Sequence, residues 1–180
     1  MPSLTPETLL EILSRVGKTF ESYPVFIETG TFMGETSSNM SKVFKKVITV
    51  EALKSLYDKA REKFKDTNVD VRYGDSGVVL KEILATVQSS AVFWLDGHYS
   101  GPDTFQGDKD YPIIEECVTI DTLFQGSEAL VMVDDMRLLN SIEGLKEQDL
   151  LNCFKNKTIK GYWYAPSNLS ERDILAIHIE

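Results

Sequence analysis

Acidic residues recur at the ends of the apolar segments of this chain, and their chemistry points to a ligand. Five short, mainly apolar runs each end at a carboxylate, in order Glu28, Glu51, Asp75, Asp96 and the pair Asp134–Asp135. In an open parallel sheet, ligands bind outside the carboxyl ends of the strands, so these side chains would line one crevice. Carboxylates repel phosphate groups and attract hydroxyls, positive charge or a metal ion. Asp also favours turns and helix N-caps, which by itself accounts for some of these positions.

The segment of residues 25–36 combines one of these acids with two glycines. Three apolar residues at its start predict a short buried strand. Gly30 and Gly34 then bracket a tight turn that contains Thr31, and the residues after it have helical character. A strand, a glycine turn and a helix can cradle a nucleotide, because glycine lets the backbone approach a ligand closely. The spacing is G-x-x-x-G rather than the dinucleotide fingerprint G-x-G-x-x-G, so an ordinary turn is an equal alternative for this segment alone.

The elements that must position the acids alternate between strands and helices. Apolar runs predict strands at residues 25–27, 47–50, 69–73, 91–95 and 129–133. Helical spacing predicts helices at residues 53–64, 78–87 and 113–124, and an opening helix that Thr5 and Pro6 begin. Short apolar strands that alternate with such helices are typical of a parallel α/β sheet.

The last part of the chain departs from this alternation. A helix at about residues 145–154 precedes two strand-like runs, 161–164 and 173–179, and a short loop joins them. A short loop favours an antiparallel hairpin. We therefore expect one α/β domain over residues 1–180, with a Rossmann-like sheet of about seven strands. The sheet should be mostly parallel, with a C-terminal antiparallel hairpin and helices on both faces.

Composition narrows the class of protein. The chain has 180 residues, 42% of them apolar, which suits a single domain with a full core. We find no apolar run of membrane-spanning length and no basic-then-apolar leader. The formal charge of −9 argues against a nucleic acid partner and favours a small-molecule substrate. Cys117 and Cys153 lack metal-type spacing and are expected to be small buried residues in a reducing compartment, so we expect a cytoplasmic location.

One cofactor meets the demands of a crevice lined by carboxylates. Glu51 lies 21 residues beyond Gly30, the spacing at which an acid meets ribose hydroxyls in a nucleotide site of this kind. S-adenosylmethionine carries a ribose, an adenine amine, an ammonium and a sulfonium, and it has no phosphate. The third strand would end beyond the ribose site, so Asp75 or Ser76 would lie at the adenine.

These residues resemble the successive motifs of the class I S-adenosylmethionine-dependent methyltransferases. The resemblance covers roughly residues 25–135 and rests on Glu28-Thr29-Gly30-x-x-x-Gly34, Glu51, Gly74-Asp75-Ser76 and Asp96. It implies that S-adenosylmethionine is bound by Glu28, Gly30, Thr31, Gly34, Glu51, Asp75, Ser76 and Asp96. The runs Glu28-Thr29-Gly30, Leu95-Asp96-Gly97 and Val133-Asp134-Asp135 are most similar to the metal-dependent sugar O-methyltransferases of the macrocin and novobiocin pathways.

The subtype resemblance implies a divalent cation, such as Mg²⁺, held by Asp96, Asp134 and Asp135. The cation would bind adjacent hydroxyls of a small acceptor such as a sugar or glycan. An alcohol that attacks a sulfonium must lose its proton, and a hard cation with oxygen ligands lowers the pKa of that alcohol. The alternative for Asp134–Asp135 is a helix-capping turn.

The chain also departs from that subtype. It is shorter and lacks an obvious substrate-capping domain, and His98 stands where those enzymes carry a further acid. Asp96 and His98 are the expected catalytic residues, with His98 either a general base or a ligand in place of a carboxylate. His178, within the last predicted strand, is expected to be structural. Residues 101–111 predict a lid over the acceptor or, alternatively, a disordered acidic loop.

Two other classes of protein remain open from the sequence. One class is the nicotinamide-dependent oxidoreductases. The glycine spacing of this chain does not match theirs, and the expected region lacks a Tyr-x-x-x-Lys pair. A non-catalytic nucleoside-binding module would keep the cofactor cleft and would need no group of three acids. An oligomer is compatible with either class.

Overall fold

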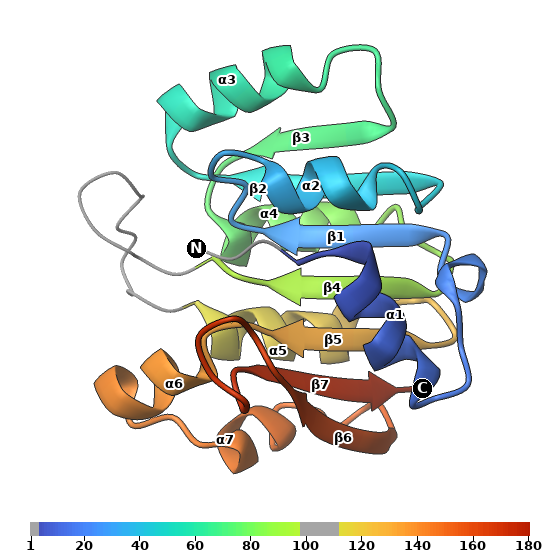
Figure 1. Ribbon diagram of the computed structural model, residues 1–180, viewed down its shortest axis with the longest axis vertical. Coiled ribbons are helices and arrows are strands. Elements are labelled where there is room, and N and C mark those ends of the chain that lie inside the picture. Colours follow the sequence, from blue (N-terminus) through green and yellow to red (C-terminus); the bar gives the residue numbers. More distant parts are fainter. Residues whose placement is uncertain (1–3, 98–111) are drawn as a thin grey trace.

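The computed structural model describes residues 4–97 and 112–180, which form a seven-stranded sheet with helices on both faces (Figure 1). The strand order is β3-β2-β1-β4-β5-β7-β6. The first five strands of that order pair in parallel, and β7 pairs antiparallel with both β5 and β6. The predicted Rossmann-like sheet with a C-terminal antiparallel hairpin is thus confirmed.

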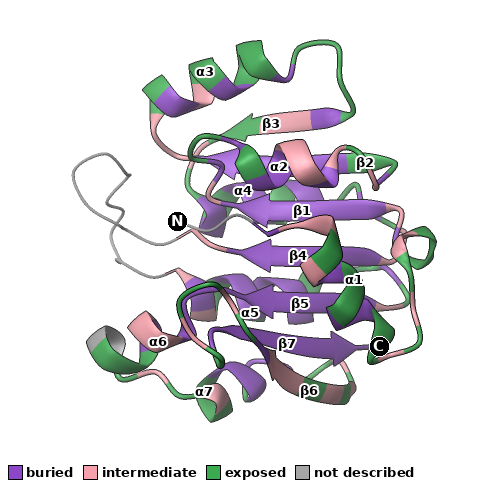
Figure 2. Ribbon diagram, viewed as in Figure 1, coloured by how far each residue is buried: buried purple, intermediate pink, exposed green. Residues whose placement is uncertain are grey.

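The strands lie close to the predicted ranges. They are β1 (Val25–Thr29), β2 (Lys46–Glu51), β3 (Val69–Tyr73), β4 (Ala91–Leu95), β5 (Ala129–Val133), β6 (Ile159–Ala165) and β7 (Ile174–Ile179). Side chains of β1, β4, β5 and β7 are buried on both faces of the sheet (Figure 2). Burial on both faces explains why these strands appear in the sequence as nearly continuous apolar runs.

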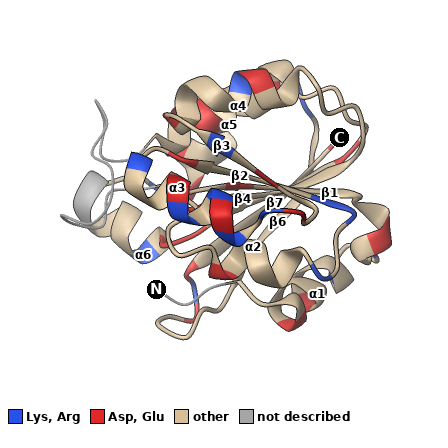
Figure 3. Cartoon of the chain, turned by 90° about the horizontal axis from the view of Figure 1, so that it is seen from above, with Lys and Arg blue, Asp and Glu red and all other residues tan. Residues whose placement is uncertain are grey.

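The helices divide between the two faces of the sheet, as the edge-on view in Figure 3 shows. They are α1 (Pro6–Ser14), α2 (Glu35–Met40), α3 (Lys54–Lys63), α4 (Ser76–Leu84), α5 (Ile113–Leu123), α6 (Met136–Leu138) and α7 (Glu147–Leu151), with a 3₁₀ turn at Phe20–Ser22 and a π-helical turn at Leu139–Glu143. Helices α1, α2 and α3 contribute to the core on one face, and α4, α5 and α7 to the core on the other. Each buried Leu, Ile or Phe in these cores contributes roughly 1.5–3 kcal/mol.

Helical spacing of Leu9, Ile12, Leu13, Val16 and Phe20 predicts one opening helix, but the helix ends before the last two of these residues. Thr5 caps it as expected, because its hydroxyl oxygen accepts a hydrogen bond from the Thr8 amide at 3.2 Å. The helix ends at Ser14, and Gly17 takes up a left-handed conformation with φ of +67°. Phe20 therefore belongs to a separate 3₁₀ turn.

The strand order places a crevice at one position along the sheet. From β1 the chain moves to β2 and β3 on one side, and β4 then returns to pair with the other side of β1. In open α/β sheets this reversal is where ligands bind, outside the carboxyl ends of the strands. The tips of β1 and β4 are therefore the position to examine.

Candidate functional site

The turn after β1 brings two strand tips into contact at Gly30. Gly30 has a φ of +85°, and a Cβ at this residue would lie 2.5 Å from the carbonyl oxygen of Asp96. Only glycine fits between these two backbones. Gly34 also has a positive φ, of +69°, but its Cβ would lie 2.8 Å from the ring of Phe64. Glycine at position 34 thus permits the turn to pack against the end of α3.

Glu28 lies beneath the turn and inside the protein. Its side chain is buried, and its Oε2 accepts hydrogen bonds from Thr49 Oγ1 at 2.7 Å and from the hydroxyl of Ser37 on α2. Thr49 also bonds to Thr31, with 2.6 Å between their hydroxyl oxygens. Burial raises the pKa of Glu28 to about 8. This carboxyl group therefore joins β1, β2 and α2 under the turn.

Glu51, at the tip of β2, fastens the glycine turn from the side. Its Oε2 accepts a hydrogen bond from the Phe32 amide at 2.8 Å, and its Oε1 accepts one from the Leu53 amide at 2.9 Å. Phe32 has a φ of +47°, which is unusual for a residue with a side chain. Each carboxylate oxygen can accept a second hydrogen bond, so ribose hydroxyls could share this group.

Asp75 and Ser76 lie where β3 leads into α4. Asp75 is exposed, and its Oδ1 accepts a hydrogen bond from the Gly77 amide at 2.8 Å, which makes Asp75 the N-cap of α4. The ordinary capping role of this acid is therefore present in the structure. The cap uses one of the two carboxylate oxygens of Asp75. Ser76 is buried in the first turn of the helix.

Asp96, Asp134 and Asp135 come together at the adjacent tips of β4 and β5. Each offers a carboxylate oxygen, and these three atoms all lie within 4.8 Å of one another. Burial raises the pKa of Asp134 to about 8, and the charges of Asp96 and Asp135 add to this effect. The structure thus brings together the three acids that the sequence singled out, in an arrangement whose oxygen donors suit a hard divalent cation.

A positive charge that was not predicted from the sequence lies beside these three acids. The Nη1 of Arg137 lies 2.5 Å from Asp135 Oδ1 and also pairs with Asp173. Asp173 is fully buried and accepts a further hydrogen bond from the hydroxyl of Ser167. An Arg two residues after the acid pair was the available signal, but Asp173 is distant in sequence and immediately precedes β7.

Glu116 is a second residue that the sequence analysis missed. It lies on α5, it is 0% exposed, and neither of its carboxylate oxygens has a hydrogen-bond partner among the described residues. The neighbouring Thr29 hydroxyl also lacks a partner in that part of the chain. Burial raises the pKa of Glu116 to about 7, although the nearby hydroxyls of Ser76 and Thr29 favour its charged form. The signal in the sequence was an acid on the apolar face that Ile113 and Cys117 define.

Other residues singled out from the sequence lie away from these acids or outside the described part of the chain. His98 and residues 101–111, expected to contain a base and a lid, lie outside the described residues. Cys117 and Cys153 are buried free thiols, as expected, although Cys153 follows α7 rather than lying within it. Among the described residues, no helix combines the length and the apolarity needed to cross a membrane.

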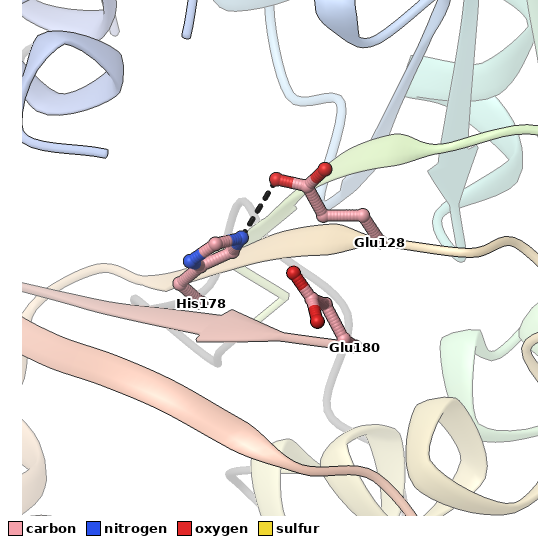
Figure 4. Close-up of side chains that lie close together, drawn as sticks. All are labelled: Glu128, His178 and Glu180. Carbon is pink, nitrogen blue, oxygen red and sulfur yellow. Dashed lines mark hydrogen bonds and ion pairs between the residues drawn. The ribbon is translucent and has the colours of Figure 1, made fainter. Parts of the chain in front are cut away.

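A second group of possible metal ligands lies at the opposite ends of the strands, where β5 begins and β7 ends. Glu128, His178 and Glu180 offer ligand atoms within 4.8 Å of one another (Figure 4). Glu128 is already engaged, because its Oε1 contacts both His178 Nε2 and the Tyr23 hydroxyl at 2.7 Å. Its Oε2 accepts a hydrogen bond from Lys18 at 2.7 Å. These contacts tie the segment before β1 to β7, which agrees with a structural role for His178.

Comparisons with known proteins identify the fold. No protein-family model matches the sequence, and no curated protein matches it. The structure is similar to the N-methyltransferase NodS from Bradyrhizobium japonicum, with a TM-score of 0.61 and 11% identity over 96% of this chain and 92% of that chain. A TehB-like SAM-dependent methyltransferase from Corynebacterium glutamicum gives a TM-score of 0.58 and 13% identity over 98% and 88%. A putative methyltransferase from Streptococcus mutans, solved in complex with SAH, gives a TM-score of 0.56 and 19% identity over the whole of both chains.

The chain therefore has the fold of the class I S-adenosylmethionine-dependent methyltransferases. The residues present also fit that cofactor. Gly30 lets the tips of β1 and β4 pack backbone against backbone, and Glu51 stands at the next strand tip with acceptor capacity for a ribose. The fold alone leaves the reaction and the acceptor undefined.

The contact at Gly30 predicts a large loss of stability from a single methyl group. Gly30→Ala would clash with the Asp96 backbone and strain a left-handed residue, so we expect it to lower the free energy of unfolding by about 1–3 kcal/mol or more. Gly161→Ala on β6 is the matched control, because nothing lies within 4 Å of its added Cβ. Urea unfolding of both variants measures the difference, and equal stability of the two would contradict a tight contact at Gly30.

The raised pKa of Glu28 predicts a pH dependence of stability. Between the ordinary value of 4.5 and the folded value of about 8, the folded protein holds a proton that the unfolded chain releases. The free energy of unfolding should therefore fall as pH rises through this window, by up to about 1.4 kcal/mol per pH unit from this residue. Glu28→Gln keeps an oxygen acceptor and should flatten that slope. Urea unfolding at several pH values from 5 to 8 tests this, and an unchanged slope in the variant would rule out Glu28 as its source.

Proposed function

We propose that this protein is an S-adenosylmethionine-dependent methyltransferase. The observation that carries the proposal is the glycine turn at Gly30, which packs against the tip of β4, with the carboxylate of Glu51 at the neighbouring tip of β2. The methyltransferase fold of the chain supports the same conclusion. A nicotinamide-dependent oxidoreductase and a non-catalytic nucleoside-binding module are the competing functions, and the group of three acids beside the cradle favours catalysis over simple binding.

The proposed reaction is O-methylation of a small hydroxylated acceptor such as a sugar or glycan, as in the metal-dependent macrocin and novobiocin enzymes. Asp96, Asp134 and Asp135 would hold a divalent cation, with Mg²⁺ the natural candidate for carboxylate ligands. We expect a protein of the cytoplasm, which can be monomeric or oligomeric, with no nucleic acid or membrane partner.

Each residue of the site has a separate task in this mechanism. The cofactor supplies an electrophilic methyl group, and the acceptor hydroxyl oxygen must approach that group after losing its proton. Glu51 would bind the ribose hydroxyls. Asp75 would accept a hydrogen bond from the adenine amine through the carboxylate oxygen that does not cap α4. The carboxylates of Asp96 and Asp134 would face the acceptor, and Asp96 or the predicted base His98 would take its proton.

Arg137 favours a second version of this chemistry that needs no metal. Its guanidinium already offsets part of the negative charge at Asp135. In that version the three carboxylates would orient the acceptor hydroxyls by hydrogen bonds, and one of them would accept the proton directly. Raised carboxyl pKa values, such as that of Asp134, suit a general base that works near neutral pH.

Removing the ribose contact should weaken cofactor binding. Glu51→Gln removes the negative charge that strengthens hydrogen bonds from ribose hydroxyls. The loss of a charge-assisted bond costs roughly 1.5–3 kcal/mol, so we expect about ten- to a hundredfold weaker binding of S-adenosylhomocysteine by calorimetry. Glu62→Gln on the exposed side of α3 serves as the control and should bind like the wild type. Unchanged affinity in Glu51→Gln would place the ribose elsewhere.

The metal-dependent version makes a separate prediction. Three carboxylates that face one another repel, and a bound cation relieves that repulsion, so Mg²⁺ or Mn²⁺ should raise the melting temperature of the wild type. Asp134→Asn should weaken this metal response by about tenfold or more while changing S-adenosylhomocysteine affinity little. Thermal melting across a metal titration measures the response. If a chelator leaves wild-type stability and methyl transfer unchanged, the metal-free version with Arg137 is correct.

A further inference from the structure

Glu116 lies close to Gly97, two residues beyond the end of β4. A Cβ built on Gly97 would lie 3.4 Å from Glu116 Oε1 and 3.2 Å from Thr29 Oγ1. Both groups therefore lie against the backbone just beyond β4, at the strand end where a ligand is expected. Glu116 comes from the first part of α5, and Thr29 is the last residue of β1.

The nearby hydroxyls of Ser76 and Thr29 offset only part of the cost of burying this carboxylate. Burying a carboxylate is costly unless it is paired or hydrogen-bonded, and neither oxygen of Glu116 has a hydrogen-bond partner among the described residues. The nearby acids Asp75 and Asp96 disfavour its charge further. The two oxygens of Glu116 and the hydroxyl of Thr29 therefore lie together against Gly97 without well-formed hydrogen bonds among the described residues. Such a group is explained most simply by a positive charge that arrives with a ligand.

We propose that Glu116 makes the site selective for a cationic cofactor over its uncharged product. This proposal rests on the proposed function, in which S-adenosylmethionine carries a sulfonium charge that S-adenosylhomocysteine lacks. Glu116 would act across the buried glycine backbone, without touching the ligand, because charges interact more strongly in a medium of low dielectric constant than in water. Loss of the sulfonium charge on methyl transfer would then weaken the attraction and favour release of the product.

The test compares two ligands that differ in one methyl group and one charge. Glu116→Gln keeps the size of the side chain and removes its negative charge. We expect this variant to bind S-adenosylmethionine about tenfold more weakly, while its affinity for S-adenosylhomocysteine stays within about twofold of the wild type, both measured by calorimetry. Glu115→Gln is the matched control, because this neighbour on α5 is exposed and pairs only loosely with Lys81 at 3.7 Å. It should change neither affinity.

The ratio of the two affinities separates a charge effect from a structural one. Equal weakening of both ligands, or no change in either, would overturn the role of Glu116 as a charge that selects the cation. Glu116→Asp retains the charge and should retain the preference for S-adenosylmethionine. Should Glu116→Gln fail to fold by circular dichroism, Glu116→Met provides a neutral side chain suited to a buried position. If the wild type binds neither ligand, the proposed function itself fails, and this inference fails with it.

Discussion

The contact between Gly30 and the Asp96 carbonyl is the constraint on which the rest of the site depends. Because Gly30 has no side chain, the backbones at the tips of β1 and β4 lie in direct contact. This contact sets the positions of the acids at that end of the sheet relative to one another. Glu51 and Lys63 hold the turn from outside, through hydrogen bonds to the Phe32 amide and to the carbonyl oxygens of Met33 and Gly34. The turn is therefore shaped before any ligand arrives, which lowers the entropic cost of binding.

Gathering acids at one end of the sheet removes several carboxyl groups from water, which is energetically unfavourable. Glu28, Asp134 and Glu116 all have raised pKa values, and burial is the main cause in each case. Two of these groups have protein partners that account for their position. Glu28 accepts hydrogen bonds from the hydroxyls of Ser37 and Thr49. Asp134 lies beside Asp135, which forms an ion pair with Arg137. Among the described residues, Glu116 makes no well-formed hydrogen bond, and the nearby hydroxyls of Ser76 and Thr29 offset only part of the cost of its burial.

The sequence predicted the fold well because its strongest signal is burial. Strands buried on both faces appear as uninterrupted apolar runs, and β3, β4 and β5 begin and end where predicted. Helix ends were less certain, since caps and left-handed glycines such as Gly17 decide them locally. The convergence of Asp96, Asp134 and Asp135 was also predictable, because adjacent parallel strands end at the same edge.

Contacts between distant segments could not be predicted in the same way. Arg137 meets Asp173 across 36 residues, and Glu116 approaches Thr29 from a helix on one face of the sheet. Strand periodicity shows that Glu28 points to one face, but it does not show that Ser37 and Thr49 occupy the space there. Such partners depend on how helices settle against the sheet, which is a property of packing and not of local sequence.

The position of β7 has a consequence for how the chain is made. β7 follows β6 in sequence but lies between β5 and β6 in the sheet, so β5 has no partner on that side until residues 174–179 are available. During synthesis on the ribosome, the other strands emerge first and leave an open, apolar strand edge. Unpaired edges of this kind recruit other strands, so β5 would stay exposed until residues 174–179, or a chaperone, cover it.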